Sequence, residues 1–430
     1  MIGSGGREHA ICWALSKNSV EPLELFCAPG NAGIAQVAKC VPIQADELPA
    51  LASYAEQSKI DLTMVGPEAP LAAGIVDEFE SSGLRIVGPN RAAARLESSK
   101  AFAKDFMARH SIPTARYRVA NSSAEAKQIL QSGEFGDDVA SVVIKADGLA
   151  AGKGVFVARD RAAALRAVRE LESGVVGAEA AKRVLIEEAL TGPEVSVLLF
   201  SDGKHYRLMP AARDHKRIGE GDTGPNTGGM GTITDASLVD DGTLNRIVRE
   251  CVEPSLLGCR DEGFPFRGIL FIGLMLTADG PRVLEYNVRF GDPETQAILV
   301  RLKSHLAEIF QAIVESRLGE TNLEWSDDAS ACVVMAAKGY PAKAETGAQI
   351  FGLNSARSDD AVIFHAATSR NPQGDWLTAG GRVLGVTATG PTLAVALARS
   401  YEAIAGIHWD GMQYRRDIGR TEASGAVGAG

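Results

Sequence analysis

Long apolar runs are missing from this 430-residue sequence, and so is the start expected of a secreted protein. The longest apolar run, Ile269 to Leu276 with Gly273 inside it, is far shorter than the roughly 18 residues that a membrane-spanning helix needs. The amino-terminal residues also lack the basic and then apolar pattern of a secretory signal. The sequence therefore predicts a cytoplasmic protein with no membrane partner.

Metal-type cysteine spacing and an excess of basic charge are missing as well. No two of the six cysteines are two residues apart, and none shares a zinc-ligand spacing with the seven histidines, so they are predicted to be reduced core thiols. Acidic residues outnumber basic ones by 54 to 44, which gives a net charge of −10. Because such a surface repels polyanions, nucleic-acid binding is disfavoured, and any phosphate site must be a local basic pocket.

Length and patterning predict a multidomain protein of the α/β and α+β classes. Residues 1–98 alternate short β-branched runs with helical stretches, and each run ends in a glycine- or proline-bearing loop. This rhythm predicts an open parallel α/β sheet, in which ligands bind at the carboxyl ends of the strands. Ser98 and Ser99 can then cap a helix that carries Phe102 and Phe106 on one face, so the first domain boundary is placed here.

The rest of the chain divides into a middle domain over 99–320, a small mixed α/β domain over 321–420 and a flexible tail over 421–430. Within the middle domain, strands joined by glycine loops predict a mobile flap subdomain at about 115–190. The polar, glycine-rich stretch 214–231 has no hydrophobic periodicity. Loops of that length inside a compact domain are usually functional or disordered, so a loop of that kind is predicted.

The first glycine cluster, Gly3, Gly5 and Gly6, suggests a dinucleotide-binding turn. That fingerprint requires a third glycine where this sequence has Glu8, so it fails. A glycine turn leading into a helix remains, whose free amides can hold a phosphate, and the neighbouring Arg7 favours an anion. A purely structural tight turn is the open alternative.

The second cluster, KADGLAAGKG at 145–154, is similar to a P-loop but departs from it at two points. Gly148 and Gly152 are one residue too close, and Gly154 replaces the required Ser or Thr. The segment joins one strand to another, which predicts a flap that closes over nucleotide phosphates with Lys145 and Lys153 offsetting the charge. An ordinary hairpin turn is the alternative.

The third cluster, Glu285, Asn287 and Arg289, lies on the strand LEYNVRF. Since side chains alternate along a strand, these three project from one face. Mg²⁺ prefers one or two protein oxygens plus substrate phosphates, and Arg suits phosphate or carboxylate. A solvated edge strand is the alternative, and Asp292 and Glu294 follow at the end of this strand.

A fourth group of carboxylates flanks a predicted turn between two strands. Glu187 and Glu188 end one apolar strand, and Glu194 begins the next. Taken alone, they are typical of a solvated turn. Beside a phosphate flap, they fit a hinge that binds adenine and ribose.

These motifs together give a sequence that resembles the ATP-grasp enzymes and, more narrowly, the glycinamide ribonucleotide synthetase family, over nearly the whole chain. The resemblance is carried by GGREHA, APGNAG, VGPEAPL, SKAF, KADGLAAGKGV, IEE, DHKR, DTGPNTGGMG, NVRFGDPETQ, VVMAAKGYP, GGRVL and IHWDGM. It implies an ATP-grasp fold in the middle domain and a carbon–nitrogen ligase of purine biosynthesis. This ligase joins glycine to 5-phosphoribosylamine through a glycyl phosphate, releasing ADP and phosphate. The implied cofactors are ATP with Mg²⁺ or Mn²⁺, and we expect a monomer.

The resemblance also implies roles for individual residues. The cofactor-binding residues are expected to be Lys100, Lys145, Gly152, Lys153, Glu187, Glu188, Leu190 and Glu194, with Glu285 and Asn287 as metal ligands. The catalytic residues are expected to be Lys145, Asp214, Arg289 and Asp292. The substrate-binding residues are expected to be Gly5, Gly6, Arg7, Gly30, Asn31, Gly33, Glu68, Asn226, Thr227, Gly229 and Met230.

One departure from the family concerns the first strand. The family has several apolar residues ahead of the glycine turn, whereas only Met1 and Ile2 precede Gly3 here. We therefore expect that the chain starts a few residues late and that an apolar extension raises thermal stability, since ladder hydrogen bonds and burial are lost. Two other functions stay open: another ATP-grasp carboxylate–amine ligase, and a nucleotide-binding protein without turnover.

Overall fold

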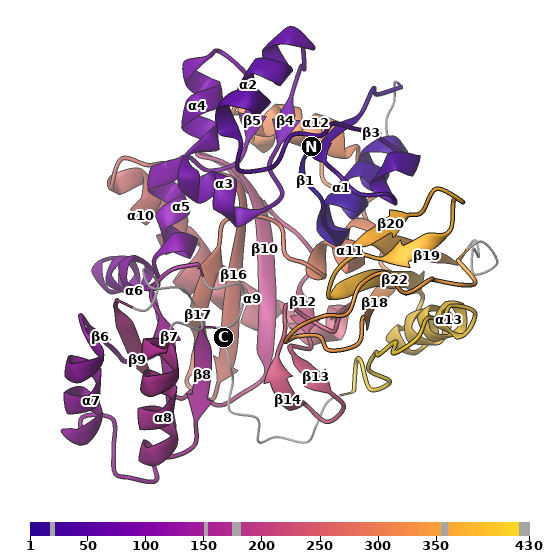
Figure 1. Ribbon diagram of the computed structural model, residues 1–430. Helices are drawn as coiled ribbons and strands as arrows, with labels where there is room; N and C mark the ends of the chain where they lie inside the picture. The colour runs from indigo at the N-terminus through magenta and orange to yellow at the C-terminus, as the bar shows by residue number, and fades with distance from the viewer. Residues whose placement is uncertain (18–21, 150–153, 174–181, 354–359, 421–430) are drawn as a thin grey trace.

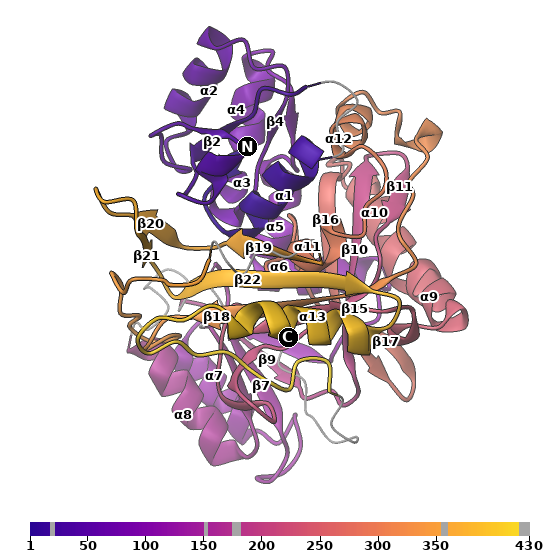
Figure 2. The same cartoon turned by 90° about the vertical axis from the view of Figure 1, so that its right-hand side faces the viewer.

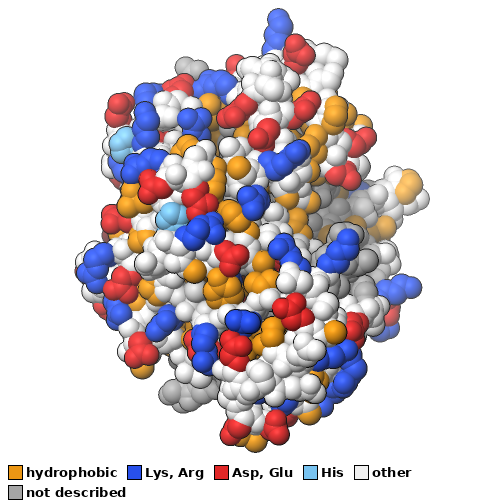
Figure 3. Space-filling view, turned by 90° about the vertical axis from the view of Figure 1, so that its left-hand side faces the viewer, with side chains coloured by type: hydrophobic (Ala, Val, Ile, Leu, Met, Phe, Trp, Pro, Cys, Tyr) orange, Lys and Arg blue, Asp and Glu red, His pale blue; other side chains and the backbone are white. Residues whose placement is uncertain are grey.

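The computed structural model describes residues 1–17, 22–149, 154–173, 182–353 and 360–420 (Figure 1). An amino-terminal α/β unit sits above a large sheet, and a small sheet covered by helices lies beside that sheet (Figures 1 and 2). Within these ranges, no helix is long and apolar enough to cross a membrane. All six cysteines are free thiols, and only Cys40 is not fully buried. On the face shown in Figure 3, basic and acidic side chains are interspersed.

The amino-terminal unit contains the predicted parallel strands. Its strands form two small parallel groups, β1 (Ile2–Gly3), β2 (Phe26–Pro29) and β3 (Lys39–Cys40), then β4 (Thr63–Met64) and β5 (Ile86–Val87). A single parallel bridge between Ile2 and Val65 joins the groups. The helices of this unit are α1 (Gly6–Lys17), α2 (Leu48–Gln57), α3 (Glu68–Ala73), α4 (Ile75–Ser81) and α5 (Arg91–Ser98), with a 3-10 turn at Ile34–Gln36. The predicted open parallel sheet is therefore present, but its first strand is only two residues long.

The predicted capped helix is α6 (Lys100–Arg109), and Ser99 caps it by accepting from the Phe102 amide at 3.2 Å. Beyond it lies a four-stranded antiparallel sheet in the order β6-β9-β7-β8. Its elements are β6 (Tyr117–Ala120), α7 (Ser123–Gln131), β7 (Val142–Ala146), β8 (Val155–Ala158), α8 (Arg161–Glu172) and β9 (Val184–Glu188). Strands β7 and β8 pair as a hairpin, so the KADGLAAGKG segment joins two strands as predicted.

The large sheet has nine strands, eight of them in the order β17-β16-β10-β12-β15-β18-β22-β19, with β11 paired to β10. Its strands are β10 (Glu194–Asp202), β11 (Tyr206–Leu208), β12 (Ala212–Asp214), β15 (Gly231–Thr234), β16 (Arg267–Thr277), β17 (Gly280–Asn287), β18 (Ala329–Ala336), β19 (Ala361–His365) and β22 (Arg382–Gly390). The sheet continues across the predicted boundary at residue 320, because β18 pairs with both β15 and β22. The predicted carboxy-terminal domain thus extends the middle sheet.

Helices and short elements complete the structure around this sheet. They are a 3-10 turn (Ala236–Leu238), α9 (Asp241–Ile247), a π-helical turn (Val248–Val252), α10 (Glu253–Asp261), α11 (Glu294–Leu299), α12 (Leu306–Val314), a 3-10 turn (Leu318–Glu320), β20 (Thr368–Arg370), β21 (Trp376–Thr378) and α13 (Leu393–Ala405). Helix α13 packs on β22 and β18, as Figure 2 shows. The apolar side chains of the large sheet, such as Leu198, Ile272 and Val333, are fully buried beneath these elements.

The polar stretch 214–231 is not the irregular loop that its composition predicts. It contains an antiparallel hairpin of β13 (Arg217–Gly219) and β14 (Thr223–Asn226) and leads directly into β15. Gly221 and Gly224 adopt positive φ angles of 63° and 79°, which glycine tolerates without steric cost. The hairpin escaped prediction because its strands bury no regular apolar face, so period-two alternation is absent.

Candidate active site

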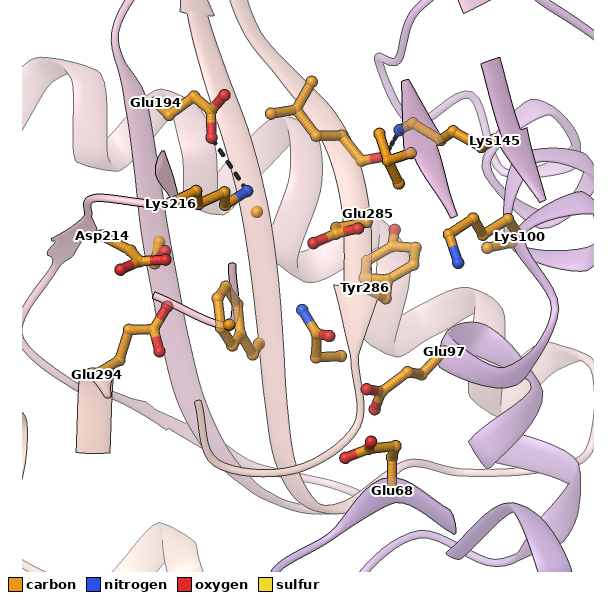
Figure 4. Close-up of a pocket in the computed structure, with 18 of the residues that line it drawn as sticks. Glu68, Glu97, Lys100, Lys145, Glu194, Asp214, Lys216, Glu285, Tyr286 and Glu294 are labelled. Carbon is orange, nitrogen blue, oxygen red and sulfur yellow. Dashed lines mark hydrogen bonds and ion pairs between the residues drawn. The ribbon is translucent and has the colours of Figure 1, made fainter. Parts of the chain in front are cut away.

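A cavity of about 380 Å³ lies where the four-stranded sheet faces the large sheet. Lys145 of β7 and Glu187 of β9 line one wall, and Glu194 of β10 with Glu285 of β17 line the other. In Figure 4, Lys145 and Lys100 approach from one side of Glu285, while Asp214, Lys216 and Glu294 lie on the other side. This lining suits a ligand that carries several negative charges and needs metal and ammonium groups to balance them.

The strand β17 places Glu285 and Asn287 in the cavity together, as their period-two spacing predicts. The pairing of β16 with β17 shifts register here, since Gly273 faces Glu285 but Leu274 faces Val283. Leu284 is the extra residue of this bulge, and its carbonyl accepts from Lys145 Nζ at 3.3 Å. The bulge thereby ties the flap strand to the strand that carries the carboxylate.

The charge state of Glu285 suits a cation ligand. Burial opposes its ionisation, but the positive charges of Lys216, Lys145 and Lys100 hold the pKa of Glu285 below its usual range. Asn287 Oδ1 offers a second hard oxygen and accepts from Arg289 Nη2 at 3.0 Å. Nowhere in the described ranges do three or more His, Cys, Asp or Glu groups gather as a metal cluster. Two protein oxygens fit Mg²⁺ or Mn²⁺, which complete their coordination with phosphate oxygens.

Buried lysines surround Glu187 on the facing wall. Its carboxylate lies 2.9 Å from Lys104 Nζ and 3.3 Å from Lys145 Nζ, and all three side chains are about 2% exposed. Burial alone would raise the pKa of Glu187, but the two ammonium groups lower it by more. The pKa therefore lies below its usual range, and the carboxylate is charged. Lys100 Nζ donates to the Gly148 carbonyl at 3.1 Å, at the start of the glycine loop. Lys100 and Lys145 thus lie where the glycine loop begins, in a position to contact a polyanionic ligand.

Strand alternation separates Glu187 from its neighbour. Glu188 lies on the opposite face of β9, where it accepts from the Arg116 amide at 2.8 Å and does not line the cavity. Leu190, just after the strand, does not line it either. The prediction treated both glutamates alike because adjacent carboxylates at a strand end carry no mark of which face is buried.

Two carboxylates face each other at the far end of the cavity, Asp214 of β12 and Glu294 of α11 (Figure 4). Burial raises the pKa of Asp214 well above its usual range, and the charge of Glu294 raises it further. Burial also raises the pKa of Glu294. Within the described structure, Asp214 Oδ1 has no hydrogen-bond partner. A pair of this kind shares a proton or binds a cationic group.

Arg289 anchors the floor of the cavity to the amino-terminal unit. Its Nη2 donates to Glu97 Oε1 at 2.8 Å, and its Nε donates to Glu68 Oε2 at 3.3 Å. Glu97 also accepts from the Val288 amide at 2.8 Å, although burial raises the pKa of this carboxyl. The guanidinium is thus held in one orientation just beyond the end of β17.

Arg382, at the start of β22, brings the carboxy-terminal part of the chain into the site. Its Nη2 lies 3.3 Å from Asp292 Oδ2, and its Nη1 donates to the Asp292 carbonyl at 2.6 Å. Burial opposes ionisation of Asp292, but Arg382 and Arg7 hold its pKa below the usual range. Asp292 is therefore a charged side chain fixed between two arginines.

The amino-terminal glycine turn already holds an anion of its own. The Gly5 amide donates to Glu8 Oε2 at 2.5 Å, and Glu8 Oε1 accepts from Arg7 Nε at 2.7 Å. The residue that breaks the dinucleotide fingerprint therefore occupies the position at the turn where a phosphate was expected. Arg7 still reaches the cavity and donates from Nη1 to the Phe290 carbonyl at 2.9 Å.

The second amino-terminal loop is tied to itself and to the carboxy-terminal strands through Asn31. Its Oδ1 accepts from the Gly33 and Ile34 amides at 2.8 and 2.9 Å. Its Nδ2 donates to the Ser4 and His365 carbonyls at 2.7 and 2.9 Å. The side chain of Asn31 is therefore engaged in holding two loops and β19 together.

The structure brings many of the predicted site residues to one cavity. Those that line it are Arg7, Glu68, Lys100, Lys145, Glu187, Glu194, Asp214, Asn226, Thr227, Glu285, Asn287, Arg289 and Asp292. Those that do not are Gly5, Gly6, Gly30, Asn31, Gly33, Glu188, Leu190, Gly229 and Met230. Gly152 and Lys153 lie outside the described residues.

Five charged residues of the cavity were not assigned from sequence: Glu97, Lys104, Lys216, Glu294 and Arg382. A signal for some of them exists. Lys100 and Lys104 are four residues apart on α6 and therefore share a face, and Lys216 belongs to the DHKR motif. Arg382 belongs to the GGRVL motif, but the motif does not indicate which site it serves, because only the order of strands in the sheet brings the start of β22 to this cavity.

The fold and the site together define an ATP-grasp enzyme, in which the strand that carries Glu285 and Asn287 faces a lysine-bearing hairpin across a charged cavity. Biotin carboxylase from Campylobacter jejuni, solved as a β,γ-ATP complex, shares this fold with a TM-score of 0.73 at 14% identity, covering 97% of this chain and 93% of that one. A likeness at that identity shows the fold alone.

Family models identify the chain more narrowly. Those for the phosphoribosylglycinamide synthetase N domain, ATP-grasp (A) domain and C domain match residues 1–97, 98–295 and 330–421. The chain belongs to the phosphoribosylglycinamide synthetase family. It is 48% identical over 421 residues to a phosphoribosylamine–glycine ligase of Brucella melitensis, covering 97% of this chain and 96% of that protein. The crystal structure of phosphoribosylamine–glycine ligase from Thermotoga maritima matches with a TM-score of 0.81 at 33% identity, covering 97% and 98%.

Proposed function

We propose that this chain uses ATP to join glycine to 5-phosphoribosylamine, giving glycinamide ribonucleotide, ADP and phosphate. Full-length relatives named phosphoribosylamine–glycine ligase support the overall reaction. The observation that carries it in this chain is that Glu285 lies opposite Lys100 and Lys145 (Figure 4), in a cavity that Asn287 also lines. The reaction is a step of purine biosynthesis, and we place it in the cytoplasm, carried out by a monomer.

The nucleotide is assigned to the space between the two sheets. Lys100 and Lys145 would contact its phosphates, Glu187 its adenine and Glu194 its ribose hydroxyls. Glu285 and Asn287 would hold Mg²⁺ or Mn²⁺, which supplies charge neutralisation for phosphoryl transfer when bound. The donor set supports this assignment because Glu285 is held in its charged form by three lysines.

The chemistry explains why so many cations converge. A carboxylate is a poor electrophile, so we infer that the glycine carboxylate first attacks the γ-phosphate of ATP and forms a glycyl phosphate. Two anions must meet in that step, and Lys145 with Arg289 would stabilise the charge that develops. The phosphoribosylamine nitrogen then attacks the acyl carbon and phosphate leaves. Since an acyl phosphate is readily hydrolysed, a site enclosed between two sheets protects it from water.

The carboxylate pair Asp214 and Glu294 is assigned to the amino group of glycine. An ammonium between them would offset the burial that raises both pKa values and the repulsion that Glu294 exerts on Asp214. Asn226 and Thr227 line the same end of the cavity and would orient the amino acid. Arg7, Glu68 and Asp292, on the amino-terminal side, would bind the phosphoribosylamine.

A coupled assay for ADP formation tests the proposal. ADP should form only when glycine and freshly made phosphoribosylamine are both present. Formate, aspartate and bicarbonate should not replace glycine. Rapid ADP formation with one of those acids would instead support a different ATP-grasp carboxylate–amine ligase, and ATP binding without turnover would support a binding protein.

A further inference from the structure

Residues 415–419, near the end of the described chain, hold the hairpin β13–β14 against the large sheet. Arg415 is the centre of this contact, and its side chain is only 2% exposed although it follows the last helix. Its Nε and Nη2 donate to the two carboxylate oxygens of Asp417 at 2.8 and 2.7 Å. This fork fixes the guanidinium, because a bidentate pair allows only one orientation.

The third nitrogen of Arg415 reaches the hairpin at two points. Its Nη1 donates to the Arg217 carbonyl at 3.1 Å on β13 and to Asp222 Oδ1 at 2.5 Å in the turn. Asp417 Oδ2 also accepts from the Gly221 amide at 2.8 Å. A single buried side chain therefore braces the first strand and the tip of the hairpin at once.

A second contact from the same segment fixes the base of the hairpin. The Gly419 amide donates to His215 Nε2 at 3.1 Å, and His215 Nδ1 lies 3.2 Å from the Gly231 carbonyl. Burial lowers the pKa of His215 to about 4, so the ring is neutral and can accept from that amide. Residues 415–419 thus contact the hairpin at its base, first strand and tip.

Residues at the base of the hairpin line one end of the cavity. Arg217 pairs with Asn226 across the two strands, and the amide and hydroxyl of Thr227 both donate to the Lys216 carbonyl at 2.8 Å. Lys216, Asn226 and Thr227 all line the cavity near Asp214. Any displacement of β13 therefore moves three lining residues together.

We propose that Arg415 is a positioning residue for the amino-acid substrate, acting through the hairpin and without touching the ligand. This inference rests on the proposed function, because it assigns the Asn226–Thr227 end of the cavity to glycine. Loss of the guanidinium would loosen the hairpin and weaken glycine binding. Lys216 also pairs with Glu194 at 3.2 Å, on the side of the cavity assigned to ATP, so a loosened hairpin should weaken ATP binding as well, but by less than it weakens glycine binding.

The test is steady-state kinetics on the full chain with variants of the brace. Arg415→Met should raise KM for glycine about tenfold and KM for ATP by no more than about threefold, while kcat changes less than about twofold. Arg415→Lys should give an intermediate KM, since it keeps the charge but loses the fork. Asp222→Asn, at a half-exposed turn, should fold normally and raise KM for glycine about threefold.

The matched control is Arg399→Met. Arg399 is another arginine of the carboxy-terminal part of the chain, and it pairs with Asp360 at 3.4 Å rather than with the hairpin. This substitution should leave both KM values unchanged. A lower melting temperature with unchanged KM for glycine in Arg415→Met and Asp222→Asn would overturn the positioning role. If wild-type ADP formation does not depend on glycine, the proposed function itself fails, which is a separate result.

Discussion

Two cavities of similar size within the described residues differ in chemistry. The active-site cavity of about 380 Å³ is lined by lysines, arginines and carboxylates drawn from distant parts of the chain. The other, of about 450 Å³, lies between the amino-terminal unit and α12 and is lined mainly by apolar residues such as Leu25, Phe26, Ile60 and Phe310. Volume alone therefore does not identify a site. A site is identified by buried charged groups that converge on one cavity and balance one another.

The apolar cavity lies next to the two-residue strand β1. Met1 donates from its amino group to the Phe26 carbonyl at 2.8 Å, and Ile2 lies between Ala28 and Val65. On the far side of Met1, residues 23–26 and 60–63 face each other across the cavity. The cavity therefore lies beside β1, between residues of β2 and β4.

The largest effect is expected where the active-site cavity holds its metal ligand. Glu285→Ala should lower kcat on the order of a thousandfold, because it removes a cation ligand at the point of phosphoryl transfer. The melting temperature should change by less than about 2 °C. ADP release and differential scanning fluorimetry measure the two quantities. The control is Glu80→Ala on the exposed side of α4, and a near-normal rate in Glu285→Ala would contradict the metal assignment.

A smaller but more informative effect is expected at the carboxylate pair. The raised pKa values of Asp214 and Glu294 mean that the folded state keeps a proton that the unfolded chain releases, so their contribution to stability falls as pH rises above the usual carboxyl range. Asp214→Asn removes this loss. Its melting temperature should exceed that of the wild type by about 2 °C at pH 8, with the gap closing toward pH 4.

The same variant should lose about a hundredfold in turnover, since the glycine ammonium loses a charged partner. Melting curves between pH 4 and pH 8, together with kinetics at pH 8, check both parts. A wild type whose melting temperature keeps rising with pH relative to Asp214→Asn would show that the carboxyl is ionised and paired in the folded state.

A tenfold effect should separate two adjacent glutamates on β9. Glu187→Gln is expected to raise KM for ATP about tenfold, because it breaks contacts with Lys104 and Lys145 in the cavity. Glu188→Gln, its matched control on the opposite face, should stay within about twofold. Equal effects of the two substitutions would mean that the face assignment of β9 does not decide nucleotide binding.

The smallest effect is expected in the apolar cavity, and it should concern stability alone. Adding Lys-Val-Leu-Val ahead of Met1 should extend β1 into this cavity. The melting temperature should rise by about 3 °C, since apolar surface is buried and further backbone hydrogen bonds form between strands. KM for ATP should not change. An equally long Lys-Ser-Asn-Ser extension serves as the control. A melting temperature no higher than that of the control would show that the cavity does not accept a strand.

Sequence reasoning reached the parts of the fold and site that have local signals. The period-two spacing of Glu285 and Asn287, the cap at Ser99 and the glycine segment between β7 and β8 all follow from short-range geometry. It missed the hairpin β13–β14, whose pairing has no apolar alternation. It also treated Gly5 as a free phosphate-binding amide, although the amide donates to Glu8.

The sequence by itself determined the family, the strand that carries Glu285 and Asn287 on one face, and the glycine segment between β7 and β8, because each depends on residue types at fixed short spacings. Only the tertiary structure decided which glutamate of β9 enters the cavity, which carboxylates face each other, and that Arg382 and the hairpin braced by Arg415 belong to the site. The physical reason is that burial and pairing of charge depend on contacts between segments up to hundreds of residues apart. No local pattern encodes those contacts.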